Sequence, residues 1–295
     1  MFKIYFTVDE FSTLVDLKDF VFPGGEVQVV VDPTKAKKAS FAVIHAHLEN
    51  SDDVMKLFLV TDAIRRLKVN RIKLYMPYVP YARQDRAANP GESHALKVFA
   101  NLINAQKYDE VIVHDPHSDV VEACFDNLTI NKNHDFVLSV LAIKRRLDPA
   151  YGENLPFWLV APDAGAMKKV TALAACLSED AYLSERSLKM MVAQGGKSRD
   201  TVTGKLTGFT VDKEDLGGLP CIVVDDICDG GGTFLGLADV LKAKNAGPLS
   251  LVVTHGIFSQ GFDKLLEKFD KVYCTDSFQK NLPTKAHKNI VVLHM

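Results

Sequence analysis

Residues 221–233 read Cys-Ile-Val-Val-Asp-Asp-Ile-Cys-Asp-Gly-Gly-Gly-Thr. Four small or β-branched apolar residues stop at two acids and a run of three glycines, and residues 235–243 then carry apolar side chains at three- and four-residue spacing. That spacing is typical of an amphipathic helix, whereas a short apolar run is typical of a strand buried on both faces. The segment therefore predicts a strand, a polar loop and a helix, which is the repeating unit of a parallel α/β sheet.

Three more apolar runs end abruptly at polar clusters. They are residues 72–76 before 81–86, residues 111–113 before 114–119, and residues 157–160 before 162–165. Helical spacing follows at 96–105 and at 166–176. The alternation predicts the α/β class, with mostly parallel sheets flanked by helices and with ligands bound outside the carboxyl ends of the strands.

The length of 295 residues favours two domains. Two of the polar clusters precede residue 130 and two follow residue 155, so we expect one α/β domain over 1–140 and a second over 141–280. A C-terminal tail, 281–295, is expected to pack back on the first domain.

Charge and composition exclude several classes of protein. With 35 basic and 37 acidic residues the formal charge is -2, so there is no general basic surface for nucleic acid or an anionic membrane. No apolar stretch is long enough for a membrane span, and Lys3 and Asp9 interrupt the N-terminus before the core of a signal peptide could form. We expect a cytoplasmic protein whose five cysteines are reduced thiols.

The glycine-rich loop predicts a site for a phosphorylated sugar. Gly230, Gly231 and Gly232 allow a tight turn whose N–H groups converge on one oxyanion, and Thr233 adds a hydroxyl where the helix begins. Asp225 and Asp226 would repel a phosphate unless they face sugar hydroxyls or a divalent cation. The alternative is a plain glycine-rich turn with solvated acids.

The cluster Tyr81-Ala-Arg-Gln-Asp-Arg86 predicts a polyphosphate site. Arg83 and Arg86 offer forked donors to phosphate oxygens, while Gln84 and Asp85 can recognise an amine or a hydroxyl. The alternative is a surface cluster of ion pairs, which is common and contributes little stability.

These segments together resemble the ribose-phosphate pyrophosphokinase family. The resemblance rests on Asp225 to Thr233, on Tyr81 to Arg86 and on Pro162-Asp163-Ala164-Gly165, with weaker matches at residues 254–259 and 99–102. It covers roughly residues 20 to 260 in the family's order. It implies two similar phosphoribosyltransferase-like domains and an enzyme that moves the β,γ-diphosphoryl group of ATP to ribose 5-phosphate.

The resemblance also implies roles for residues. Arg83, Gln84, Asp85 and His117 would hold ATP, and Phe22 and Glu26 would reach the adenine bound by a neighbouring subunit. Ribose 5-phosphate would bind to the loop residues Asp225, Asp226, Asp229, Gly230, Gly231, Gly232 and Thr233. His117 and Asp163 would place Mg²⁺, the implied cofactor, on the ATP phosphates, with the histidine acting on the ion or on water or phosphate. Lys197 and Arg199 match a catalytic Lys-x-Arg on a mobile loop.

Two alternatives remain at this point. A phosphoribosyltransferase would share the Asp225 to Thr233 motif but would not need Tyr81 to Arg86. A non-catalytic regulatory relative would be expected to lose Lys197, Arg199 and the acid pair, which are all retained. We also expect a homo-oligomer, either a dimer or a hexamer.

Overall fold

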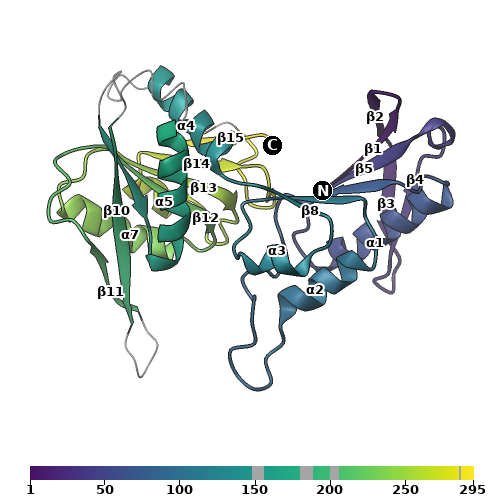
Figure 1. The fold of residues 1–295 in the computed structure, drawn as a ribbon, viewed down its shortest axis with the longest axis horizontal. Coiled ribbons are helices and arrows are strands. Elements are labelled where there is room, and N and C mark those ends of the chain that lie inside the picture. Colours follow the sequence, from purple (N-terminus) through teal and green to yellow (C-terminus); the bar gives the residue numbers. More distant parts are fainter. Residues whose placement is uncertain (148–155, 180–188, 200–205, 286) are drawn as a thin grey trace. The chain divides into compact units, whose positions relative to one another are not determined.

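The computed structural model describes residues 1–147, 156–179, 189–199, 206–285 and 287–295 (Figure 1). The chain divides into two compact units, Met1–Lys132 and Asn133–Met295. The division precedes the helix His134–Leu147, whereas the boundary expected from the sequence, near residue 140, falls inside that helix. Val137 and Val140 of that helix belong to a core cluster of the second unit, which explains why the helix belongs there.

The first unit is an α/β sheet with an antiparallel edge. Its elements are β1 (Phe2–Val8), β2 (Phe11–Val15), β3 (Leu17–Val21), β4 (Val27–Val31), a short 3₁₀ helix (Ala36–Lys38), β5 (Phe41–Ala46), α1 (Ser51–Arg66), β6 (Ile72–Tyr75), α2 (Ala95–Asn104), β7 (Glu110–His114), α3 (Val120–Cys124) and β8 (Leu128–Asn131). The main sheet has the order β2-β1-β5-β6-β7-β8, and β3 pairs with β4 in a separate hairpin. Strands β5 to β8 are parallel, while β1 is antiparallel to both of its neighbours.

Burial alternates along the strands of this sheet. In β5, Ala42, Ile44 and Ala46 are fully buried, whereas the residues that alternate with them are half-buried. Helix α1 begins after Asn50, whose side chain accepts a hydrogen bond from the Asp53 N–H, and it contributes Leu57 to the same core. One face of the sheet therefore packs in the core of the first unit.

The second unit has a larger parallel sheet. Its elements are α4 (His134–Leu147), β9 (Phe157–Ala161), α5 (Ala164–Glu179), β10 (Met190–Arg199), β11 (Leu206–Val211), β12 (Cys221–Cys228), α7 (Gly232–Ala243), β13 (Leu249–Gly256), α8 (Asp263–Lys268), β14 (Lys271–Thr275) and β15 (Ile290–Leu293). The order is β11-β10-β9-β12-β13-β14-β15, and only the pair β10–β11 is antiparallel among these strands. Figure 1 shows that pair as a long hairpin.

Central strand β12 is buried from both sides. Val223 belongs to a core cluster with Leu237 of α7, whereas Val224 belongs to a different cluster with Val170 of α5. Because alternate residues of a strand face opposite ways, the sheet is covered by helices on both faces. This confirms the predicted α/β class with mostly parallel sheets.

The tail differs from its prediction. Residues Ile290–Leu293 form β15, which pairs in parallel with β14 in the second unit's sheet, with Ile290 opposite Val272. The apolar run pairs with this open sheet edge, and Ile290 is buried there.

None of the described helices is long and apolar enough to cross a membrane.

Candidate functional site

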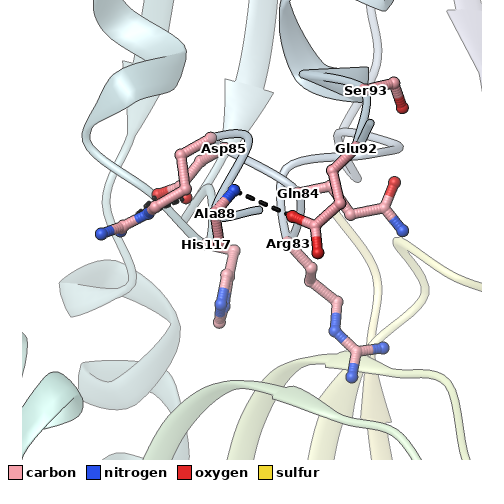
Figure 2. A pocket seen from close by; sticks show the side chains of 8 residues that line it. Arg83, Gln84, Asp85, Ala88, Glu92, Ser93 and His117 are labelled. Carbon is pink, nitrogen blue, oxygen red and sulfur yellow. Dashed lines mark hydrogen bonds and ion pairs between the residues drawn. The ribbon is translucent and has the colours of Figure 1, made fainter. Parts of the chain in front are cut away.

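A polar pocket lies in the first unit beside the loops that follow β6 and β7. Its volume is about 660 Å³, and its lining residues are Arg83, Gln84, Asp85, Arg86, Ala88, Glu92, Ser93 and His117. In Figure 2 the side chains of Arg83 and His117 extend in the same direction from the two loops. The structure thus brings together four of the six first-unit residues that were assigned to ATP, and the other two, Phe22 and Glu26, do not line the pocket.

The backbone of the first loop turns back on itself at Tyr81. This residue adopts a φ of 64°, which is uncommon for a residue with a side chain, and its carbonyl accepts the Gln84 N–H at 2.9 Å. Because the backbone turns here, the chain does not continue as a strand, and Arg83 and Gln84 are exposed. Sequence alone gives no sign of a left-handed tyrosine.

Asp85 joins the two loops of the pocket. Arg86 donates to both of its carboxylate oxygens, with Nε to Oδ1 at 2.8 Å and Nη2 to Oδ2 at 3.2 Å, and Ser118 Oγ donates to Oδ2 at 2.7 Å. The hydrogen bonds from Arg86, followed by the one from Ser118, lower the pKa of Asp85 to about 2. Asp85 is therefore ionised at neutral pH, and its carboxylate links the loop after β6 to the loop after β7. No role for Ser118 was predicted from the sequence.

The loop after Arg86 is closed by Glu92. One Glu92 oxygen accepts the N–H group of Ala88 at 2.8 Å (Figure 2) and that of Asn89 at 3.1 Å. The other oxygen accepts the Asn89 side-chain amide at 2.6 Å. These donors lower the pKa of Glu92. Pro90 and Gly91, whose φ is 89°, complete the turn. The loop therefore adds a fixed negative charge to the rim of the pocket.

The glycine loop of the second unit leads directly into a helix. Gly231 has a φ of 78° and precedes α7, which begins at Gly232 and runs for 12 residues. A Cβ at Gly231 would lie 3.2 Å from the Leu265 side chain, so the position has neither the backbone freedom nor the space for a larger residue. The N–H groups at the start of α7 give the local charge that a phosphate needs.

Three acids lie near this loop. Asp226 is buried at 4% exposure, and its N–H donates to Asp225 Oδ1 at 2.9 Å. Burial, followed by the charge of Asp226 and more weakly that of Asp163, raises the pKa of Asp225. Lys169 of α5 places its Nζ 3.4 Å from Asp226 Oδ2. The Ala166 N–H at the start of α5 donates to Asp163 Oδ1 at 3.1 Å.

These acids fit a divalent cation by their chemistry. Mg²⁺ prefers oxygen ligands from carboxylates, water and phosphate. A bound cation would add positive charge to that of Lys169 and would relieve the repulsion between the carboxylates of Asp225 and Asp226, which contributes to the raised pKa of Asp225. Within the described ranges, no group of three or more histidine, cysteine, aspartate or glutamate side chains is close enough to hold a metal ion by itself. An ion at either predicted ligand, His117 or Asp163, would therefore need water or substrate oxygens as well.

The remaining predicted residues lie on two hairpins. Lys197 and Arg199 belong to β10, where Lys197 pairs with Phe209 and Arg199 pairs with Leu206 across the β10–β11 hairpin. Their backbone is therefore strand and not the loop that was expected, while their side chains lie outside what the structure describes. Phe22 and Glu26 form the turn between β3 and β4, where the Phe22 N–H donates to the Glu26 carbonyl at 2.8 Å. Both are exposed and neither lines the pocket.

Comparisons with known proteins place these features in one family. Residues 12–106 match the family described as the N-terminal domain of ribose phosphate pyrophosphokinase. A ribose-phosphate pyrophosphokinase of Hyphomonas neptunium is 32% identical over 274 residues, which cover 92% of this chain and 82% of that protein. One of Agrobacterium fabrum is 31% identical over 274 residues, with the same two shares.

Among solved structures, the fold is similar to that of phosphoribosylpyrophosphate synthetase from Mycobacterium smegmatis. The TM-score is 0.74 at 21% identity, and the match covers 96% of this chain and 87% of that one. The fold agrees with the similarity in sequence to the curated relatives. The chain belongs to the ribose-phosphate pyrophosphokinase family.

Proposed function

We propose that the chain is an active ribose-phosphate pyrophosphokinase, which converts ATP and ribose 5-phosphate into AMP and 5-phosphoribosyl 1-diphosphate. The observation that carries this proposal is the Asp225 to Thr233 segment, in which an acid pair is followed by a glycine turn at the N-terminus of a helix. A phosphorylated sugar with free hydroxyls suits both halves of that segment. The family membership supports the same assignment.

The reaction needs no covalent nucleophile from the protein. The anomeric hydroxyl of the sugar attacks the β-phosphorus, the bond from that phosphorus to the oxygen shared with the α-phosphate breaks, and AMP leaves with the electron pair. The hydroxyl proton is lost to solvent or to a base. Positioning and electrostatic stabilisation therefore account for most of the catalysis.

Each group of residues has a defined task in this proposal. Arg83 and Gln84 bind the nucleotide, with Asp85 fixed between Arg86 and Ser118 to hold the loop. The N–H groups around Gly231 bind the 5-phosphate, and Asp225 with Asp226 accepts hydrogen bonds from the sugar hydroxyls. Bound Mg²⁺ would supply positive charge to the ATP phosphates, with His117 and Asp163 as the side chains that hold it or its water. Lys197 and Arg199 would neutralise the charge on the transferring group.

We also propose a homo-oligomer, a dimer or a hexamer, in which Phe22 and Glu26 reach a neighbour's nucleotide. Large apolar side chains on β2, β3 and β4 support this idea, because Phe11, Phe20 and Val30 are 80%, 46% and 51% exposed. Light scattering coupled to size-exclusion chromatography tests it directly. A monomer at micromolar concentration would contradict the oligomer and leave the chemistry open.

The assay for the function measures AMP and the diphosphorylated sugar after incubation with ATP, Mg²⁺ and ribose 5-phosphate. The proposal predicts equal amounts of both products and none when ribose 5-phosphate is omitted. Pyrophosphate consumption with a free nucleobase would favour a phosphoribosyltransferase instead. Binding of ATP without AMP formation would favour a non-catalytic regulatory relative.

A further inference from the structure

Lys169 lies on the side of α5 that packs against the sheet. Ala166, Val170 and Leu173 are the buried residues of this helix around it, at 8%, 1% and 3% exposure. Position 169 is three residues after 166 and four before 173, so it shares their face. Lysine is almost never placed on a core-facing stripe unless its ammonium group has a partner. Neighbouring Lys168 is exposed, as expected for the solvent side.

Lys169 forms an ion pair with Asp226. Nζ lies 3.4 Å from Asp226 Oδ2, and the two side chains are 29% and 6% exposed. The other Asp226 oxygen, Oδ1, accepts the Ile227 N–H at 3.0 Å. The carboxylate is thus held at one oxygen by its own strand and at the other by α5, which fixes its plane.

The surroundings explain why a cation is needed here. Asp225 precedes Asp226 in the same strand, and Asp163 at the start of α5 is close enough to raise the pKa of Asp225. A buried carboxylate among like charges is costly unless it is paired, because water no longer solvates it. Lys169 supplies that charge from within the protein, on the helix that follows Asp163.

We propose that Lys169 is a positioning residue for the sugar site, whose ammonium group holds the Asp226 carboxylate in the orientation that accepts hydroxyl groups of ribose 5-phosphate. This inference rests on the proposed function. Lys169 itself does not contact the reacting atoms. It acts through Asp226, so its removal affects the sugar substrate and leaves the nucleotide site in the first unit unchanged.

Lys169→Met tests the inference because methionine keeps the unbranched apolar stem and removes the charge. We expect KM for ribose 5-phosphate to rise on the order of 10-fold, by analogy with the loss of a group that orients a metal ligand. KM for ATP should change by less than about twofold. Lys169→Arg keeps the charge and should restore most of the affinity, while Lys168→Met, one residue away on the exposed side, should behave like the wild type. Titration calorimetry with ribose 5-phosphate alone gives a readout independent of turnover.

A double-mutant cycle shows whether Lys169 acts through Asp226. In an Asp226→Asn background, Lys169→Met should add little further loss of sugar affinity, because no carboxylate is left to orient. If Lys169→Met alone does not fold, the variant that carries both Lys169→Met and Asp226→Asn is compared with Asp226→Asn alone. If the double variant lost about a further 10-fold in affinity for ribose 5-phosphate relative to Asp226→Asn, the inference would be overturned.

The outcomes separate the inference from the proposed function. A wild-type protein that forms no diphosphorylated sugar contradicts the function. An active wild type, together with a folded Lys169→Met variant whose sugar affinity is unchanged, overturns only the role of Lys169. Equal losses for ATP and for ribose 5-phosphate would also overturn it, because they indicate general disruption.

Discussion

Replacement of Ser118 by alanine tests the link between the two loops of the nucleotide pocket. The change removes the hydrogen bond from Ser118 Oγ to Asp85 Oδ2 at 2.7 Å and the one that Oγ accepts from the Val120 N–H at 3.2 Å. Arg86 still binds Asp85 in the variant. The pKa of Asp85 should therefore rise from about 2 but remain below its ordinary value.

The size of the effect follows from that pKa. A fall from 3.8 to about 2 corresponds, at about 1.4 kcal/mol per unit, to at most about 2.5 kcal/mol for all interactions with the carboxylate. Arg86 is the first cause and Ser118 the second. The Asp85 side chain is 16% exposed, but that of Arg86 is 77% exposed, so solvent screens part of the total. Ser118→Ala should thus lower the free energy of unfolding by about 1 kcal/mol at neutral pH.

The pH dependence has a definite sign. A carboxyl whose pKa is lowered by folding stabilises the protein above its unfolded pKa, and this stabilisation is lost as the pH falls from about 4 towards 2. The difference between wild type and Ser118→Ala in urea unfolding should be full at pH 7 and should shrink in that range. KM for ATP should rise by up to about fivefold, which is the equivalent of 1 kcal/mol.

A matched control is Ser139→Ala, because Ser139 is exposed and donates only to a backbone carbonyl of its own helix among the interactions described. It should show no such pH dependence. If Ser118→Ala left the Asp85 pKa, followed by NMR, and the unfolding free energy both unchanged, the assignment of Ser118 as the link between the loops would be wrong.

Three further predictions address the second unit. Lys197→Ala should lower kcat on the order of 10² with an unchanged circular dichroism spectrum, and an unaltered rate would remove that residue from catalysis. Gly231→Ala should lower the free energy of unfolding by about 1 to 2 kcal/mol, because the φ of 78° at this position is strained for alanine and the new Cβ would meet Leu265. Urea titration measures this change. A change in the free energy of unfolding within about 0.5 kcal/mol would contradict the prediction. Burial raises the pKa of Cys221 and of Cys274 to about 12. At pH 8 both thiols should therefore react with a chromogenic disulfide reagent only after denaturation. Rapid reaction of either thiol in the folded protein would refute its burial.

The sequence was informative wherever a short apolar run stopped at polar residues. Each such run proved to be a strand, and the helices predicted at 96–105 and 166–176 appear as α2 and α5 with ends within a few residues. This succeeds because a strand buried on both faces and an amphipathic helix each impose a local pattern that the sequence must satisfy.

The antiparallel parts were not predicted. β1 and β2 form a hairpin, as do β3 and β4, and their burial depends on neighbours distant in sequence. The same reason explains the tail, whose short apolar run could have paired with several edges. Propensity cannot choose among partners that only the tertiary structure brings together.

In the candidate site, sequence identified the residues that carry charge but not those that orient them. Ser118 gave no signal, because an isolated serine after a histidine is common in loops. Lys169 did give one, since a lysine three residues after Ala166 falls on the apolar stripe of its own helix. Its partner, however, lies 57 residues away in another strand, so the contact could not be read from the sequence.

Tracing the phosphates of ATP shows whether the enzyme moves the diphosphoryl group as one unit. With ribose 5-phosphate and Mg²⁺ present, label in the γ-phosphate should appear in the sugar product and label in the α-phosphate should appear in AMP. That result would establish transfer of the intact β,γ-diphosphoryl group. Formation of ADP together with a singly phosphorylated product, or no transfer by the folded protein, would contradict the account.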